Sequence, residues 1–118
     1  AEGAAPSLDP AAYTPLVSPP CRFWADPFLV EDGGRTHLFF EDYRFDQRKG
    51  LISWAEVLPD GRLGPTETVL ERPYHLSYPH VFEHDGEIFM VPESQEAGRV
   101  DLLRAHRFPD QWVHETTL

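Results

Sequence analysis

Residues 23–42 read FWADPFLVEDGGRTHLFFED, two largely apolar runs on either side of Asp32-Gly33-Gly34. Asp-Gly between runs of β-prone residues is a strong signal for a hairpin, because glycine adopts the positive φ that the tight turn requires. We predict strands over Pro27–Glu31 and Thr36–Asp42. Acidic residues precede the first strand and end the second, so the hairpin is expected to carry carboxylates at those two places.

The same pattern returns about fifty residues later, a spacing that points to an internal repeat. Residues 78–94, YPHVFEHDGEIFMVPES, align so that Pro79 falls on Pro27, Gly86 on Gly34 and Glu93 on Glu41. After a shorter loop the match resumes between Gly50–Glu56 and Gly98–Arg104, and then between Glu67–Leu70 and Glu115–Leu118. Units of this length with four strands each are typical of propeller blades. We therefore predict an all-β fold of two four-stranded antiparallel blades.

The repeat divides the chain into three parts. Residues 1–21 form an irregular, proline-rich lead-in, residues 22–71 the first blade and residues 72–118 the second. Tyr13, Leu16 and Val17 are expected to anchor the lead-in to the core. Each unit of such an array buries its faces only against neighbours, and about three or more units are usually needed. We expect the two blades to be completed by self-association or to belong to a longer chain.

The composition limits the partners of the chain. Its 118 residues, 41% of them hydrophobic, suffice for one domain or a piece of one. Lys and Arg number 10 against 20 Asp and Glu, a net charge of −10 at pH 7. Such a chain has little means to displace counterions from phosphates, which argues against nucleic acid and against an anionic membrane surface. Cations, neutral polar ligands and basic proteins remain possible.

Several kinds of site and segment are absent from the sequence. Cys21 is the only cysteine, so no intrachain disulfide is possible, and this favours a reducing compartment such as the cytoplasm. No window approaches the ~20 apolar residues of a membrane-spanning helix, so we expect no membrane insertion. No phosphate-binding glycine loop, Gly-x-Ser-x-Gly motif or metal-ligand spacing occurs. We expect no metal and no cofactor.

Five segments carry a resemblance to known proteins: Phe23–Phe28, Phe39–Asp42, His75–Pro79, Met90–Ser94 and Phe108–Trp112. In them the chain resembles the five-bladed propeller glycoside hydrolases. It resembles more closely the N-terminal domain of glucosamine inositolphosphorylceramide transferases and of bacterial formyltransferase-like fusion proteins. The resemblance covers about residues 22–118. It implies that the chain holds the first two of five blades and lacks the later acidic residues of the hydrolases.

Asp26 is the candidate catalytic residue. The resemblance implies that Asp26 lies at the mouth of an innermost strand and faces a central channel as nucleophile or base. Glycoside hydrolysis needs two carboxyl groups a set distance apart, so Asp26 cannot catalyse it alone. The alternative interpretation gives Asp26 a local role in the turn into the strand, because Asp-Pro favours turn initiation.

Further candidates could bind a ligand, and each also has a purely structural interpretation. Glu41, Asp42 and Glu93 end their strands and could hold sugar hydroxyls, or they are simply solvated. Trp24 could stack on a sugar ring beside Asp26, and Tyr78 takes the place of Asp26 in the second unit. His75 and His80 flank Tyr78 and could donate hydrogen bonds to a sugar, ligate a metal together with Glu93, or be satisfied by the backbone. We interpret His37, His84, His106 and His114 as surface or rim residues, and expect Trp54 and Trp112 to pack between the units or to close the outer turn.

These observations support three functions. The chain is a carbohydrate-recognition module accessory to a larger enzyme, or a structural, self-assembling half-propeller without catalysis, or part of a glycosidase that uses Asp26 as nucleophile or base. The residues leave open whether the chain takes part in catalysis.

Overall fold

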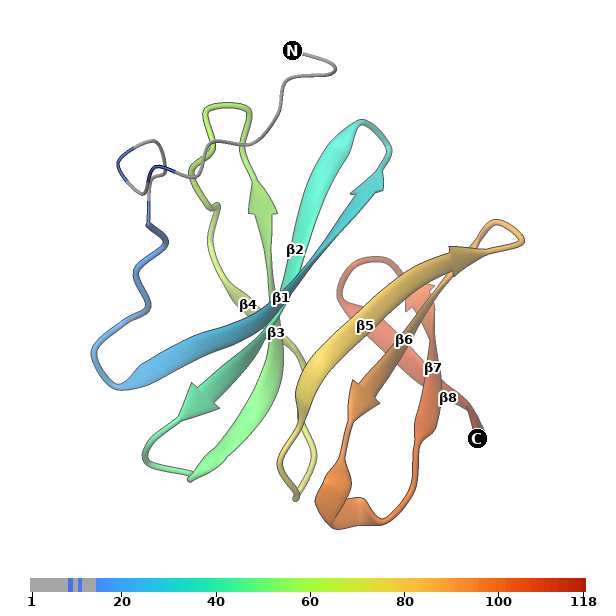
Figure 1. Ribbon diagram of the computed structural model, residues 1–118. Coiled ribbons are helices and arrows are strands. Elements are labelled where there is room, and N and C mark those ends of the chain that lie inside the picture. The colour runs from blue at the N-terminus through green and yellow to red at the C-terminus, as the bar shows by residue number, and fades with distance from the viewer. Residues whose placement is uncertain (1–8, 10, 12–14) are drawn as a thin grey trace.

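The computed structural model describes residues 9, 11 and 15–118 as two four-stranded antiparallel sheets side by side (Figure 1). In each sheet the strands follow one another in chain order. The first sheet contains β1 (Arg22–Asp32), β2 (Arg35–Arg44), β3 (Lys49–Val57) and β4 (Glu67–Leu70). The second contains β5 (Ser77–His84), β6 (Glu87–Glu93), β7 (Asp101–Arg107) and β8 (Gln111–Thr117), with a short 3-10 helix, η2 (Gln95–Ala97). The all-β prediction with two four-stranded antiparallel sheets is confirmed.

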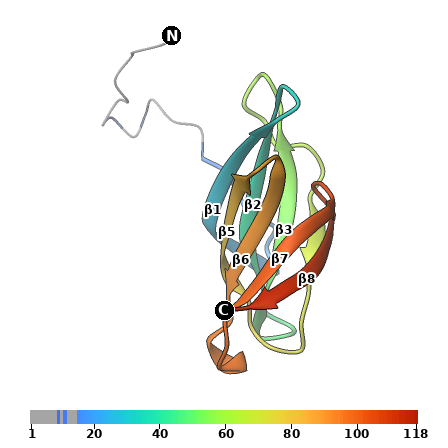
Figure 2. The ribbon, with the colours of Figure 1, turned by 90° about the vertical axis from the view of Figure 1, so that its right-hand side faces the viewer.

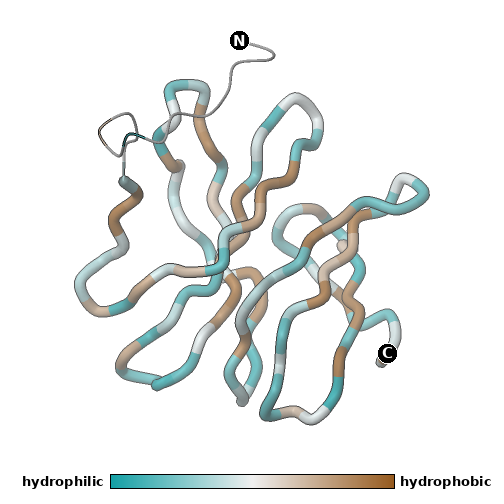
Figure 3. Tube along the Cα trace, viewed as in Figure 1, coloured by the Kyte–Doolittle hydropathy of each residue, from teal (hydrophilic) through white to brown (hydrophobic). Residues whose placement is uncertain are grey.

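The two predicted hairpins form around their glycine turns. Gly33 and Gly34 have φ values of 59° and 76°, and Asp85 and Gly86 have φ values of 50° and 78°. Positive φ at both central residues gives a turn whose twist matches that of the flanking strands. Figure 2 shows that the strands of both sheets lie along roughly the same axis, with neighbouring strands antiparallel. Hydrophilic residues gather at the turns, and hydrophobic residues gather in the strands between them (Figure 3).

The first strand is longer than predicted and contains a bulge. The register between β1 and β2 shifts between Ala25 and Phe28, where Asp26 has a φ of 51°. A bulge re-aims side chains while the strand continues on either side of it. Pro27 therefore lies inside β1, and the prediction that the strand begins there is wrong.

The second sheet has a bulge at the matching place. The register between β5 and β6 shifts between Ser77 and His80, where Tyr78 has a φ of 46°. Positive φ is uncommon for residues other than glycine, and more costly for a bulky side chain. Both bulges thus put a non-glycine residue in the left-handed conformation immediately before a proline.

The main core lies between the two sheets. Phe39, Ile52 and Leu70 of the first sheet form one buried cluster with residues of the second, which include Ile88, Met90 and Leu103. Contacts between elements place β5 against β1, β2 and β3, and β8 against β4. Neighbouring strands within each sheet are hydrogen-bonded, and this apolar cluster packs one sheet against the other.

Aromatic residues near the β7–β8 turn extend the core. The rings of Phe108 and Trp112 each lie 5.8 Å from the ring of Phe39. Trp112 therefore packs between the sheets, as predicted. His37 is 5% exposed and accepts a hydrogen bond from Trp54 Nε1 at 3.0 Å, so the prediction that His37 is a surface residue is wrong.

The other face of the first sheet carries a smaller core of Leu38, Phe40 and Ala55. β2 is therefore covered on both faces. Leu16 and Val17 are 54% and 80% exposed, so the prediction that they anchor the lead-in is wrong, while Tyr13 lies outside the described residues. No helix among the described residues is long and apolar enough to span a membrane.

Candidate functional site

Three acidic side chains from three strands come together between the sheets. Asp26 of β1 hydrogen-bonds to Glu41 of β2, and the charges of Asp26 and of Glu93 on β6 both act on Glu41. The register places Glu41 opposite Ala25, and the bulge that follows Ala25 presents Asp26 to it. We call Asp26, Glu41 and Glu93 the carboxylate cluster. Sequence reasoning selected all three residues, and the fold brings them together.

Glu41 holds its proton more tightly than an ordinary glutamate. Its side chain is 9% exposed, and this burial is the largest cause that raises the pKa of Glu41 to about 7. The hydrogen bond to Asp26 and the negative charges of Asp26 and Glu93 raise it further. Two adjacent carboxyl groups avoid ionising together, so a proton shared between them is favoured. Near neutral pH Glu41 therefore donates a hydrogen bond to Asp26 in a large share of molecules.

His75 contacts Glu41 from the connection between the sheets. Its Nε2 lies 3.3 Å from Glu41 Oε1, and its Nδ1 accepts the backbone N–H of Gly50 at 2.8 Å. The N–H of Leu76 donates to the carbonyl oxygen of Gly50 at 3.0 Å. Two backbone-anchored hydrogen bonds thus fix the connection, and with it the ring of His75, beside the carboxylate cluster.

Gly50 leaves the space that this arrangement needs. A Cβ at this position would overlap the carbonyl oxygen of Leu76 and would lie 3.0 Å from Glu41 Oε1. Sequence reasoning did not select Gly50 as a functional residue. A glycine inside a strand often marks a close approach of another backbone, and that was the available signal.

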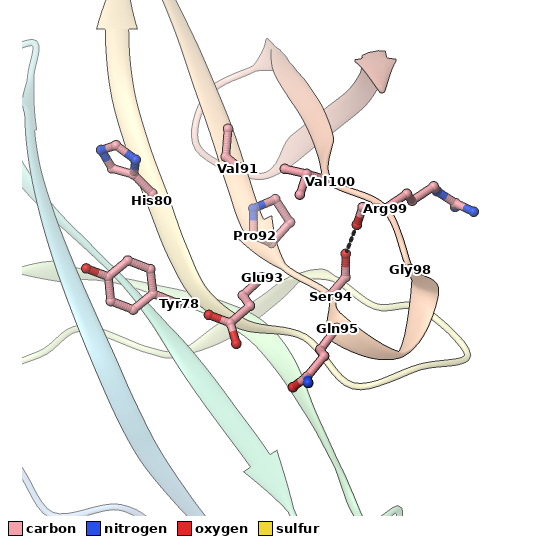
Figure 4. A pocket seen from close by; sticks show the side chains of 10 residues that line it. All are labelled: Tyr78, His80, Val91, Pro92, Glu93, Ser94, Gln95, Gly98, Arg99 and Val100. Carbon is pink, nitrogen blue, oxygen red and sulfur yellow. Dashed lines mark hydrogen bonds between the residues drawn. The ribbon is translucent and has the colours of Figure 1, made fainter. Parts of the chain in front are cut away.

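Tyr78, His80 and Glu93 line a pocket of about 560 Å³ on the second sheet (Figure 4). Tyr78 is 52% exposed, and its ring packs edge-on against Phe28 with the ring centroids 4.9 Å apart. His80 is also exposed, with its ring centroid 5.6 Å from that of Phe28. Arg99 lines the pocket as well, and its carbonyl oxygen accepts the hydroxyl of Ser94 at 3.0 Å. Glu93 belongs both to this pocket and to the carboxylate cluster, so the two features are continuous.

Trp24 and Asp42, two of the predicted ligand residues, are not brought to the cluster. Neighbouring residues of a strand point to opposite faces, so Asp42 faces away from Glu41. Asp42 is 1% exposed, accepts the hydroxyl of Ser53 at 2.8 Å, and pairs with Arg22 at 3.5 Å and Arg44 at 3.3 Å. Trp24 belongs to the small core of the first sheet, where its ring lies 4.9 Å from that of Phe40.

Comparison with known proteins gives the family. The family model described as "Glucosamine inositolphosphorylceramide transferase 1, N-terminal" matches residues 4–118. The chain belongs to this family. It is 40% identical over 100 residues to glucosamine inositolphosphorylceramide transferase 1 of Arabidopsis thaliana, a match that covers 84% of the chain. It is 38% identical over 100 residues to the proteins of that name from Oryza sativa subsp. indica and subsp. japonica, again over 84% of the chain.

The chain spans 13% of the length of each of these relatives. No solved structure matches it. The N-terminal family of the transferase is thus established for the chain, whereas the activity named for the relatives belongs to much longer proteins.

In this member of the N-terminal family, the carboxylate cluster lacks the arrangement of a metal site. Nowhere in the described part of the chain do three or more His, Cys, Asp or Glu side chains lie where they could hold one ion. The cluster instead combines Glu41, whose pKa is raised to about 7, with Asp26 and Glu93, and Glu93 lines the pocket. Such a set can accept hydrogen bonds from the hydroxyl groups of a ligand.

The raised pKa of Glu41 predicts that the family domain loses stability as the pH rises. The unfolded chain releases the proton of Glu41 near pH 4.5, and the folded chain releases it near pH 7. Between these values the folded state binds more protons, so its stability falls with increasing pH. We expect a contribution of roughly 2–3 kcal/mol, measured by urea unfolding at pH 5 and pH 8.

Glu41→Gln is the matched variant for this prediction. An amide can donate to Asp26 at every pH, as the neutral acid does. The variant should therefore be more stable than the natural chain at pH 8 and should show a flatter dependence on pH. An unchanged slope between pH 5 and pH 8 in Glu41→Gln would contradict the assignment to Glu41.

Proposed function

We propose that residues 22–71 and 72–118 are the first two blades of a five-bladed propeller. Support comes from the like strand order of the two sheets, from the turns at Gly34 and Gly86, and from the matching bulges at Asp26 and Tyr78. A bulge is a specific backbone feature, so its recurrence immediately before the aligned prolines Pro27 and Pro79 favours a true repeat over chance similarity.

We propose further that the chain recognises carbohydrate as an accessory module of a larger enzyme. The observation that carries this proposal is the carboxylate cluster beside the exposed ring of Tyr78, at the edge of a pocket of about 560 Å³. Ligand sites of this size combine apolar and aromatic surface with a few polar groups that fix orientation. A carbohydrate presents both hydroxyl groups and an apolar ring face, which match those two kinds of surface.

Each residue has a distinct part in the proposed site. The carboxylates of Asp26 and Glu93 accept hydrogen bonds from hydroxyl groups, and Glu41 holds Asp26 through the hydrogen bond between them. The ring of Tyr78 stacks on the sugar, and His80 offers a further polar contact. The name of the relatives, glucosamine inositolphosphorylceramide transferase 1, is consistent with a carbohydrate ligand. The chain spans only 13% of those proteins, so we assign it recognition and leave the transfer to the rest of the polypeptide.

A glycosidase that uses Asp26 is the second candidate. The observation in its favour is the pKa of Glu41, about 7, which suits a general acid near neutral pH. The direct hydrogen bond between Asp26 and Glu41 counts against these two residues as the pair of catalytic carboxyl groups. A sugar must fit between two catalytic carboxyl groups, which lie about 5 Å apart in retaining enzymes and about 6.5–9.5 Å apart in inverting ones.

A self-assembling half-propeller is the structural alternative. Phe82 and Phe89 stack with their ring centroids 5.7 Å apart, and Val113 is 37% exposed. Across the strands of the second sheet, Phe82 pairs with Phe89, Phe89 with Arg104, and Arg104 with Val113. Phe82, Phe89 and Val113 therefore share one face of that sheet. Light scattering over a concentration series distinguishes the cases: a defined oligomer supports assembly between copies, and a monomer counts against it.

Sugar binding to the 118-residue chain tests the proposed recognition. We expect binding in a panel of neutral monosaccharides and amino sugars, followed by NMR titration. Tyr78→Ala should weaken the affinity about 10-fold, in line with the loss of ~1–1.5 kcal/mol from an aromatic contact. Asp26→Asn should weaken it by a similar factor because a carboxylate is the stronger acceptor.

The matched control is Asp32→Asn, at the C-terminal end of β1, which should bind as the natural chain does. Absence of binding across the panel, or equal affinities for Tyr78→Ala and the natural chain, would count against recognition. Hydrolysis of aryl glycosides that Asp26→Asn abolishes would instead favour the glycosidase.

A further inference from the structure

Three aromatic rings lie side by side where β1 begins and β2 ends. The ring of Phe23 stacks on that of Tyr43, with the centroids 4.8 Å apart and an angle of 17° between the planes. The ring of Phe45, in the turn that follows β2, lies 5.9 Å from each of them. Phe23 and Phe45 are nevertheless 42% and 52% exposed. We call Phe23, Tyr43 and Phe45 the aromatic platform.

The strand register places the aromatic platform on the same face of the first sheet as the carboxylate cluster. Phe23 lies opposite Tyr43, and residues directly opposite each other share a face. Side chains alternate along a strand, so Tyr43 shares a face with Glu41 and Phe39 of β2. Phe39 belongs to the core between the sheets. The platform therefore lies on the face that is turned toward the second sheet.

His75 lies between the aromatic platform and the carboxylate cluster. The centroid of its ring is 5.9 Å from that of Tyr43, and its Nε2 is 3.3 Å from Glu41 Oε1. The side chain of His75 is 32% exposed, so it forms part of the surface between the two features. Gly50, which lies opposite Tyr43, adds no side chain to this surface. The platform is therefore continuous with the site already described.

A second aromatic surface lies on the other side of the carboxylate cluster. The ring of Tyr78 packs against Phe28, and Phe28 lies opposite Phe39. Phe39 and Tyr43 are four residues apart on β2, with Glu41 midway between them, a distance of roughly 13 Å along the strand. This distance exceeds the length of a single sugar ring. The carboxylates thus lie between two aromatic surfaces, one at Tyr78 and one at the platform.

We propose that the aromatic platform is a second sugar subsite, so that the chain recognises an oligosaccharide that lies along β1. The inference rests on the carbohydrate site proposed above and extends it. One ring of the ligand stacks on Tyr78, its neighbouring hydroxyl groups meet the carboxylate cluster, and a further ring stacks on the exposed surface of Phe23 and Phe45. The ligand is thereby specified as a chain of at least two sugars.

The position of the aromatic platform favours a sugar over another propeller blade. The face that carries the platform already receives the second sheet. A further blade would pack on the opposite face of the first sheet, where Leu38 and Phe40 lie, or on the outer face of the second sheet. Aromatic surfaces on both sides of a few polar groups suit a ligand that has apolar ring faces and hydroxyl groups. A second copy of the chain is the alternative occupant.

Affinities for saccharides of increasing length test the second subsite. The neutral series is glucose, cellobiose and cellotriose, and the amino-sugar series is glucosamine with the chitosan dimer and trimer. In at least one series the natural chain should bind the trimer about 10-fold more tightly than the monomer, because the trimer adds an aromatic contact. Phe45→Ala should lower this ratio to about 2-fold, and Phe45→Trp should preserve it. General damage to the protein lowers both affinities alike and leaves the ratio unchanged.

Leu29→Ala is the matched control. Leu29 is 64% exposed and also lies on β1, but it pairs with Leu38, on the other face of the sheet. This variant should keep the ratio of the natural chain. Equal affinities of the natural chain for monomer and trimer, or an unchanged ratio in Phe45→Ala, would overturn the second subsite and leave the proposed recognition standing. Absence of binding in both series would contradict both ideas.

A second measurement needs no substitution and applies even if the variants fold poorly. At constant protein concentration, the NMR signals of the Phe23, Tyr43 and Phe45 rings should shift when the trimer is added to the natural chain. Ring signals that stay in place while those of Tyr78 shift would overturn the second subsite alone. Platform signals that respond to protein concentration and not to sugar would indicate a second copy on this surface, and would also overturn the proposal.

Discussion

Replacing Gly50 with alanine should destabilise the protein by about 3 kcal/mol, as expected when an added group meets atoms that cannot yield. The new Cβ would overlap the carbonyl oxygen of Leu76, a backbone atom on the connection between the sheets. Relief requires this connection to move, and the movement breaks the hydrogen bonds from Gly50 to His75 and from Leu76 to Gly50. Urea unfolding at constant pH measures the loss.

Gly64→Ala is the matched control for this substitution. A Cβ at Gly64 would lie 3.6 Å from the carbonyl oxygen of Glu56 and 3.9 Å from its Cβ, which are ordinary contacts. Alanine at position 64 reduces the conformational freedom of the unfolded chain. We therefore expect Gly64→Ala to stabilise the protein by up to about 1 kcal/mol. Equal unfolding midpoints for Gly50→Ala and Gly64→Ala would show that the connection is not held as described.

Asp42→Ala should cost about 3 kcal/mol, because breaking a buried ion pair by removing one partner leaves uncompensated charge. The carboxylate of Asp42 is 1% exposed and faces the guanidinium groups of Arg22 and Arg44, which are 20% and 27% exposed. Without it, two like charges remain close together and Ser53 loses its acceptor. The residual exposure of both arginines keeps the expected loss at the lower end of the range for buried pairs.

An exposed ion pair provides the comparison for Asp42. Glu87 lies 3.8 Å from Arg104 and is 56% exposed, so Glu87→Ala should change stability by less than about 1 kcal/mol. Asp42→Asn keeps the shape of the side chain and should be intermediate. A folded Asp42→Asn chain should bind sugar with the affinity of the natural chain. If Asp42→Asn kept its fold but lost sugar binding, Asp42 would be one of the residues that bind the ligand.

The hairpins were predictable because their signal is local. An Asp-Gly turn between apolar runs determines which residues pair, and Gly33, Gly34 and Gly86 adopt the required φ. The bulge at Asp26 was not predictable in the same way. Proline usually begins a strand or interrupts it, and only the register of the partner strand shows that β1 continues through Pro27.

The site was predictable as a set of residues but not as an arrangement. Strand alternation alone would have separated Asp42 from Glu41, since neighbours on a strand point to opposite faces. The meeting of Glu41 with Glu93 depends on how the two sheets pack, which no local pattern encodes. His37 was misassigned for a related reason: β2 is covered on both faces, so polarity no longer distinguishes an inner from an outer face.

At position 78 the backbone is left-handed, so the residue that suits the proposed function differs from the residue that would suit folding. Tyr78 has a φ of 46°, a conformation that costs a bulky residue of order 1 kcal/mol and that asparagine or aspartate tolerates better. The tyrosine recovers little of this cost by burial, since it is 52% exposed. Selection for stability alone would replace it with a smaller residue. In a laboratory population screened only for thermal resistance, position 78 is therefore where we expect the aromatic ring to be lost first.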